Sequence, residues 1–226
     1  MTAGVKTYYT LVSSLPPLPH FERAERLPIT RYRLEQRLRM LEAEDASQLS
    51  AAEALIGWRP QRPVAKADEE MHRYYRAVID RPLHPALREF IEFRMDQQTV
   101  MAALRRKRSK MGLPSGGQRW GAGRWVRWIE EHWDDPDFRL GSIVPWISEA
   151  RNYVESGEAV HLERLLMNTS WQRLSRMADR NLFGFEAVIA YVFRWDIVKN
   201  WLAHDGEAGK KKFQELMKEV MDGQQR

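Results

Sequence analysis

The stretch ALREFIEFRMDQQTVMAALRRKRSKM, residues 86–111, carries the pattern that decides the fold. Its apolar residues recur every three or four positions, and residues with this spacing share one face of an α-helix. They are Leu87, Ile91, Met95, Val100, Met101 and Leu104. Helix-interrupting residues flank the stretch, with Pro82 and Pro85 before it and Gly112 and Pro114 after it. The pattern therefore predicts a long amphipathic helix over 86–111.

Most of the remaining chain also favours helices. Thr30 is a candidate N-cap for a helix that continues to Met40, and acidic residues from Asp68 suit the first turn of another. Further helices are expected over 50–57, 121–133, 142–156, 158–180, 183–203 and 207–222. Strand-like alternation is weak, although YYTLVSSL at 8–15 fits a short helix or a short strand. We therefore expect an all-α fold, an elongated multi-helix bundle. A single domain should span residues 1–226, with a flexible Gly/Pro-rich joint near 112–123.

Composition narrows the class of protein. The 226 residues are 43% hydrophobic, which is enough to build the core of one medium domain. Cysteine is absent, which excludes disulfides, thiolate metal sites and cysteine nucleophiles. The N-terminus lacks the features of a signal peptide, and the most apolar stretch, 183–193, is far shorter than the roughly 20 residues that span a bilayer. These features predict a soluble, cytoplasmic protein.

No catalytic constellation can be assembled from the sequence. The six histidines show no HExxH spacing, and the chain contains no P-loop, no GxGxxG and no GxSxG motif. Carboxylates do cluster at Glu130, Glu131, Asp134, Asp135 and Asp137, and such groups can bind a metal or transfer protons. They follow apolar tryptophans and lead into a proline, which favours a solvated helix end. We expect no catalytic residue, no cofactor, no metal and no small-molecule substrate.

The most distinctive feature is a basic stretch that we define as residues 97–129, which contain no acidic residue. Its eight cations are Arg105, Arg106, Lys107, Arg108, Lys110, Arg119, Arg124 and Arg127, and Trp120, Trp125 and Trp128 lie among them. Three interpretations remain open: a solvated face over core tryptophans, a docking surface for an acidic protein, or a binding site for single-stranded nucleic acid. The three-residue spacing of Trp125 and Trp128 favours the core, and no nucleic-acid motif accompanies the cations.

Three segments resemble a small bacterial family of unnamed function whose genes lie inside V-type (A/V-type) ATPase operons. They are YYTLVSSLPPLPHF at 8–21, LPITRYRLEQRLRML at 27–41 and NLFGFEAVIAYVFRWDIVKNWL at 181–202. A more distant similarity links DQQTVMAALRRKRSKMG, at 96–112, to the rotor-cap subunit of these ATPases, called C or d. That subunit often has Asp-x-x-Asn followed by Leu-Arg-x-Lys and a glycine. Here Asp96, Leu104, Arg105, Lys107 and Gly112 match, and Thr99 replaces the asparagine.

The same subunit has a late helix of the type Glu-Ala-Val-Leu-Ala-Tyr, to which Glu186 through Tyr191 is similar. The resemblance implies part of an all-helical funnel that connects the central shaft to the membrane rotor ring, although this chain is about a third shorter than the usual cap. It therefore implies a non-catalytic subunit in proton or sodium transport, whose partners are other ATPase subunits. Such a protein would be cytoplasmic and would reach the inner membrane only through the complex. The alternative from a different class is a basic helical module that binds nucleic acid or an anionic surface.

Overall fold

The computed structural model describes residues 7–58, 67–113 and 120–223, with side chains described for 7–58, 70–113 and 120–204. Within these ranges the chain is all-α, as predicted, and contains no strand. Its elements are α1 (Tyr9–Ser14), the 3-10 turn η1 (Phe21–Arg23), α2 (Arg31–Leu38), α3 (Ala43–Ile56), α4 (Ala67–Ile79), α5 (Pro85–Arg108), α6 (Val126–Glu131), α7 (Ile147–Ser156), α8 (Ala159–Arg180) and α9 (Phe185–Gly223). No helix of the described residues is both long and apolar enough to cross a membrane.

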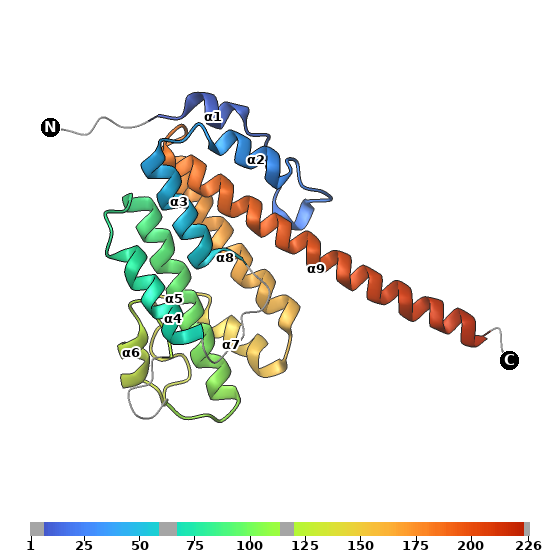
Figure 1. Ribbon diagram of the computed structural model, residues 1–226. Helices are drawn as coiled ribbons and strands as arrows, with labels where there is room; N and C mark the ends of the chain where they lie inside the picture. The colour runs from blue at the N-terminus through green and yellow to red at the C-terminus, as the bar shows by residue number, and fades with distance from the viewer. Residues whose placement is uncertain (1–6, 59–66, 114–119, 224–226) are drawn as a thin grey trace.

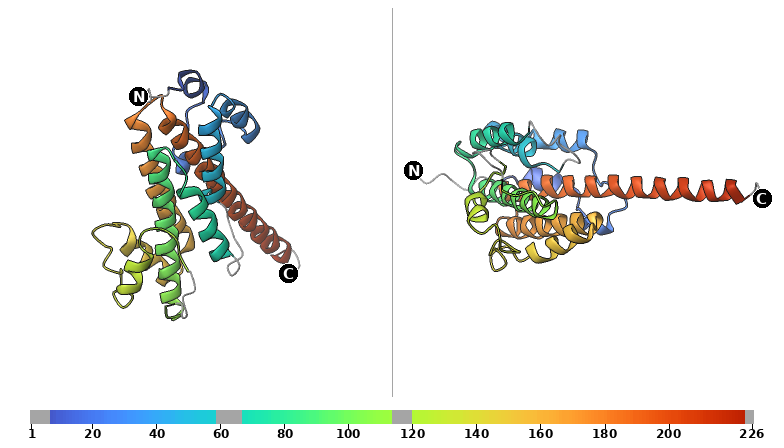
Figure 2. Two further views of the ribbon diagram at one scale, coloured as in Figure 1. Left: turned by 60° about the vertical axis from the view of Figure 1, so that its left-hand side comes forward. Right: turned by 90° about the horizontal axis from the view of Figure 1, so that it is seen from below.

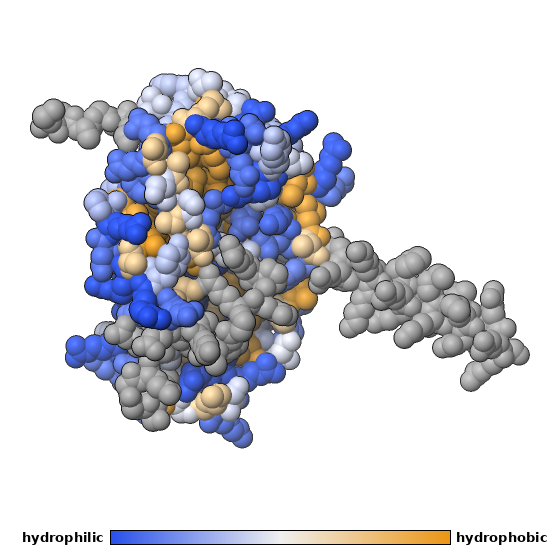
Figure 3. All heavy atoms as spheres, in the orientation of Figure 1, coloured by the Kyte–Doolittle hydropathy of each residue, from blue (hydrophilic) through white to orange (hydrophobic). Residues whose placement is uncertain are grey.

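Three long helices organise the molecule. Helix α8 packs along the first part of α9, and α5 contacts both (Figures 1 and 2). Helices α3 and α4 lie on one side of this group, α1 and α2 cover one end, and α6 and α7 lie at the other end. The remainder of α9 projects away from the body (Figure 1). Hydrophilic side chains dominate the face in Figure 3, and apolar ones gather in its upper part.

The core has two main apolar clusters that share α5 and α8. The upper one joins α3, α4, α5, α8 and α9 and includes Phe90, Met95 and Trp171. The lower one joins the end of α5 to α6, α7 and the start of α8, and includes Val100 and Ile129. Because the apolar face of α5 passes from one cluster to the other, this helix positions the basic stretch at the lower end of the body.

Local sequence explains where several helices begin. Pro85 occupies the first turn of α5, where its missing N–H costs nothing, and His84 Nδ1 accepts a hydrogen bond from the backbone N–H of Ala86 at 3.3 Å. The predicted N-cap is confirmed at Thr30, whose hydroxyl accepts from the N–H of Arg33 at 3.3 Å. The helices predicted from 86 and from 158 agree closely with α5 and α8.

Four predicted helix boundaries are wrong. Helix α3 begins at Ala43 rather than near residue 50, because Glu44 and Asp45 supply the acidic first turn that suits a helix start. Helix α7 begins only at Ile147, beyond Pro145. The two helices expected over 183–203 and 207–222 form one element, α9. Of the two alternatives left open for 8–15, the short helix is the one that forms, as α1.

The fourth error concerns 121–133, where only Val126–Glu131 is helical. Gly123 has φ +106, a conformation that a helix does not contain and that side chains rarely adopt. The preceding residues therefore form a loop that is fixed to α5 by the contacts described below. Residues 114–119 of the predicted joint lie outside the described residues.

The three segments that carry the family resemblance meet at one end of the body. The indole N–H of Trp195 in α9 donates to the carbonyl of Ile29 at 2.8 Å, and the hydroxyl of Tyr191 donates to the carbonyl of Pro16 at 2.9 Å. The backbone N–H of Tyr8 donates to the carbonyl of Phe183 at 2.6 Å. These contacts give the segments a shared structural role, the attachment of the N-terminal residues to α9.

Candidate partner-binding surface

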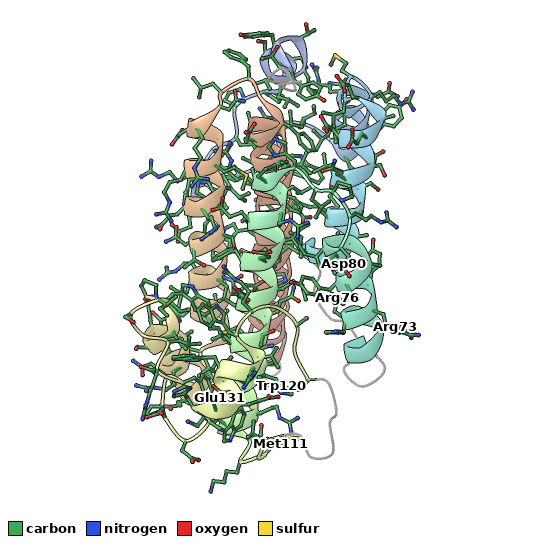
Figure 4. All side chains as sticks on the ribbon, turned by 90° about the vertical axis from the view of Figure 1, so that its left-hand side faces the viewer. Arg73, Arg76, Asp80, Met111, Trp120 and Glu131 are labelled. Atoms are coloured by element: carbon green, nitrogen blue, oxygen red, sulfur yellow. The ribbon has the colours of Figure 1, made fainter. Side chains whose placement is uncertain are left out.

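The basic stretch begins in the last turn of α5, where Arg105 through Arg108 follow one another. Cations are favourable there because the helix dipole leaves partial negative charge at its C-terminal end. Lys110 then takes a left-handed conformation, with φ 53, and turns the chain out of the helix. Met111, Trp120 and Glu131 lie at this end of the molecule, while Arg73 lies on the neighbouring α4 (Figure 4).

Two of these cations are engaged within the fold. Arg106 donates to the carbonyl of Gly112 at 3.0 Å. Lys107 donates to the carbonyl of Asp135 at 2.5 Å, and its ammonium lies 5.0 Å from the centre of the Phe138 ring. Partial burial lowers the pKa of Lys107, and nearby carboxylates offset part of this shift. Both residues therefore help to hold the lower end of the fold together.

The loop before α6 is attached to α5 by Asp96. This carboxylate is buried, and it accepts from the backbone N–H of Arg124 at 2.8 Å and from its Nε and Nη2 at 2.9 and 2.6 Å. Burial raises the pKa of Asp96, and the hydrogen bonds from Arg124 counteract part of that increase. Thr99 adds a second attachment, because its hydroxyl accepts from the N–H of Ala122 at 3.1 Å and also bonds to the carbonyl of Ala122.

The acidic cluster pairs with one further cation of the basic stretch and with two arginines outside it. Arg127 pairs with Glu131 at 2.8 Å, and Asp135 and Asp137 pair with arginines outside the basic stretch. Within the described residues, no group of three or more histidine, aspartate or glutamate side chains could hold a metal ion. The acidic cluster is thus a partly exposed, ion-paired surface.

The basic surface that remains is smaller than the sequence suggests. We use the name α5-end patch for its exposed cations, Arg105, Arg108 and Lys110, whose side chains make no hydrogen bond or ion pair with the described residues. Arg119 lies outside the described residues. The acid-free sequence marks the region as a whole, and the structure separates its exposed cations from those already engaged within the fold.

The tryptophans of the region are mostly engaged in the fold. Trp120 is buried and donates to Glu130 at 2.8 Å, and Trp125 is half-buried beside Arg124. Trp128 is 37% exposed, so its predicted core position is wrong. It lies against His132 and donates to the carbonyl of Phe138 at 2.9 Å. Its exposure follows from the shortness of α6, which has six residues and buries only Ile129.

The other positions that match the rotor-cap motif have separate locations. Leu104 is buried in the lower cluster, and Gly112 is exposed. Glu186, in the first turn of α9, accepts from Asn181 at 3.2 Å and lies 3.8 Å from His84. Tyr191 is buried, and burial raises its pKa to about 12. These side chains do not converge with Asp96 on one site.

Sequence reasoning missed two charged residues, the buried Arg94 and the partly buried Asp196, which both contact Trp58. Arg94 stacks on the ring of Trp58 at 4.0 Å and donates to Gln97. Asp196 accepts from the backbone N–H of Trp58 at 2.5 Å and from the side chain of Asn200 at 3.3 Å. Burial lowers the pKa of Arg94 to about 10 and raises that of Asp196. Only one signal of these contacts is present in the sequence: α5 and α9 each have a charged residue at a position where the helical spacing predicts an apolar one.

A family model described as "Protein of unknown function (DUF2764)" matches residues 50–224, which is more than half of the chain. No curated protein and no solved structure is significantly similar to this chain.

Proposed function

We propose that this chain, a member of the DUF2764 family of proteins of unknown function, is a non-catalytic subunit of a bacterial V-type ATPase or ATP synthase. Its place is that of a connector, similar to the rotor cap, between the central shaft and the membrane rotor ring. It acts in proton or sodium transport, and it lies in the cytoplasm, peripheral to the inner membrane through the complex. The assignment to this machine rests on the sequence resemblance.

One observation carries the docking part of this proposal. The α5-end patch presents three exposed cations, two in the last turn of α5 and one just beyond it, and the apolar face of α5 is anchored in both core clusters. Electrostatic complementarity of this kind selects a partner and its orientation, and like charges placed across an interface cost several kcal/mol. A rigid basic end therefore suits an acidic face of another subunit.

The arrangement of the tryptophans and of the long helices supports a mechanical role better than binding of single-stranded nucleic acid. Sequence-tolerant binding of single strands needs aromatic rings on which bases can stack. Here Trp120 is buried, Trp125 is half-buried, and Trp128 already stacks on His132 with ring centres 4.3 Å apart. A connector instead needs stiff contacts between helices, which the long packing of α8 along α9 provides.

Affinity purification from native membranes tests the assignment. The tagged full-length chain should co-purify with the catalytic and shaft subunits of the V-type ATPase in fixed ratio. A chain that purifies from membranes without any ATPase subunit would exclude the assignment. Tight, strongly salt-dependent binding to single-stranded DNA would favour the nucleic-acid alternative instead.

A further inference from the structure

A second surface lies between α5 and α8, apart from the α5-end patch. It is a groove of about 260 Å³, bounded by Phe93 and Gln97 of α5, by Arg173 and Arg176 of α8, and by two short segments, 124–125 and 143–146. Helices α5 and α8 lie next to each other on the side shown in Figure 4. All of the lining residues belong to the described part of the chain.

The charge of the groove is positive. Three arginines and one carboxylate line it, and that carboxylate, Asp96, is already bound by Arg124. Outside the groove, Glu89 is shared by two arginines, at 2.9 Å from Arg173 and 3.0 Å from Arg180. Arg176 is exposed, and its side chain makes no ion pair or hydrogen bond with the described residues. One acid shared by two arginines, together with an unpaired arginine, leaves net positive charge along α8.

Two of the three guanidinium groups, those of Arg173 and Arg124, are held in position before any ligand arrives. The Arg173 guanidinium lies 4.8 Å from the ring centre of Phe93, and its Nε is buried without a hydrogen-bond partner among the described residues. Arg124 lies 5.8 Å from the ring centre of Trp125. Arginines stacked on aromatic rings lose less freedom when they bind, so they favour recognition of planar anions.

Apolar side chains form the other wall. Trp125 and Trp146 are half-buried, and Ile143 is 55% exposed at the edge. Tryptophan and arginine are among the residues most enriched at the energetic centres of protein interfaces. At about 260 Å³ the groove is near the lower end of the roughly 300–1,000 Å³ of small-molecule sites, and it has room for a few side chains of a protein segment.

We propose that this groove binds an acidic segment of a partner protein. An aspartate or glutamate carboxylate lies between Arg173 and Arg176, and an adjacent apolar side chain packs on Trp125, Trp146 and Ile143. Neighbouring arginines already bind carboxylates in this way: Arg124 holds Asp96 through two guanidinium nitrogens, and Arg173 and Arg180 share Glu89. The inference concerns the chemistry of the segment and holds whichever complex the protein joins.

Selection of displayed random dodecapeptides on the immobilised full-length chain tests the proposal. Enriched peptides should share an acidic residue next to a large apolar one. A selected peptide, measured by fluorescence anisotropy, should bind Arg176→Gln about tenfold more weakly, because a hydrogen bond to a charged group is lost. Ile143→Asp should weaken it similarly by placing a like charge beside the ligand. Arg33→Gln, an exposed arginine of α2, is the matched control and should bind normally.

Three results would overturn the inference. One is the absence of any enriched acidic peptide, and another is binding that Arg176→Gln and Ile143→Asp leave unchanged. The third is full competition by millimolar inorganic phosphate or AMP with no dependence on the apolar residue of the peptide, which would identify a phosphate site. The pull-down of ATPase subunits is a separate measurement, so either proposal can fail without the other.

Discussion

Asp96 binds Arg124 through both its backbone N–H and its guanidinium, which fastens the loop before α6 to the middle of α5. The carboxylate is buried, whereas 56% of the Arg124 side chain is exposed. Asp96 and Thr99 fall within the segment that resembles the rotor-cap motif. Their observed contacts give both residues a structural task in this chain.

Asp96→Asn should destabilise the fold. The neutral amide keeps the shape of the side chain but loses the charge-assisted bonds, so the free energy of unfolding should fall by about 2 kcal/mol. Urea denaturation measures the change. Glu131→Gln, which breaks the exposed pair with Arg127, is the control and should cost at most about 0.5 kcal/mol. Equal effects for the two variants would contradict the structural role of Asp96.

Two glycines in the same region should respond differently to alanine. At Gly123, a Cβ would lie 2.6 Å from Asp96 Oδ1, and φ is +106. Gly123→Ala should therefore cost about 1–3 kcal/mol of unfolding free energy. A Cβ at Gly112 would meet no atom within 4 Å, so Gly112→Ala should be neutral or slightly stabilising. Thermal unfolding of the two variants side by side checks the prediction.

The stability contribution of Asp196 should depend on pH. Burial raises the pKa of Asp196 above its ordinary value of 3.8, so the folded protein keeps this proton at pH values where the unfolded chain has lost it. The contribution of the protonated carboxyl group to the free energy of unfolding is fully present below that ordinary value. It is lost as the pH rises through the pKa that Asp196 has in the folded protein. Relative to Asp196→Asn, the wild type should lose unfolding free energy as pH increases from about 4. Denaturation of both proteins between pH 4 and 7 measures this difference, and an opposite slope would contradict it.

Charge reversal at the α5-end patch tests docking. Arg105→Glu with Arg108→Glu should leave the fold intact and abolish co-purification with ATPase subunits, because like charges across an interface cost several kcal/mol. Arg106 is spared, since it bonds to the Gly112 carbonyl. The control, Arg33→Glu with Arg39→Glu, makes the same change in net charge on exposed residues near the other end of the body (Figure 1). Normal assembly of the folded Arg105/Arg108 variant would show that the patch is only a solvated face.

The isolated protein should not bind ATP tightly, because its sequence lacks a P-loop. Isothermal titration calorimetry with ATP and Mg²⁺ should give no saturable heat in the micromolar range. Stoichiometric micromolar binding would contradict the non-catalytic assignment.

Periodicity was sufficient for the all-α fold because long helices such as α5 and α8 repeat their apolar face over several turns. It failed where a tertiary contact overrides local preference. The loop around Gly123 is held by Asp96, which lies far from it in sequence, and no local pattern contains that information. The groove was missed for a similar reason. Arg173 and Arg176 look like an ordinary solvated helix face until Trp125 and Trp146 are placed opposite them.

Helix α9 contains 39 residues, and at 1.5 Å per residue it is about 58 Å long. Starting a helix is the unfavourable step, with an equilibrium factor of order 10⁻³, whereas each further residue extends it at little cost. The first part of α9 is folded against α8 and therefore supplies the nucleus for the projecting part. The outer turns thus require no separate initiation event. A force applied near Gly223 passes along one unbroken series of backbone hydrogen bonds into the core.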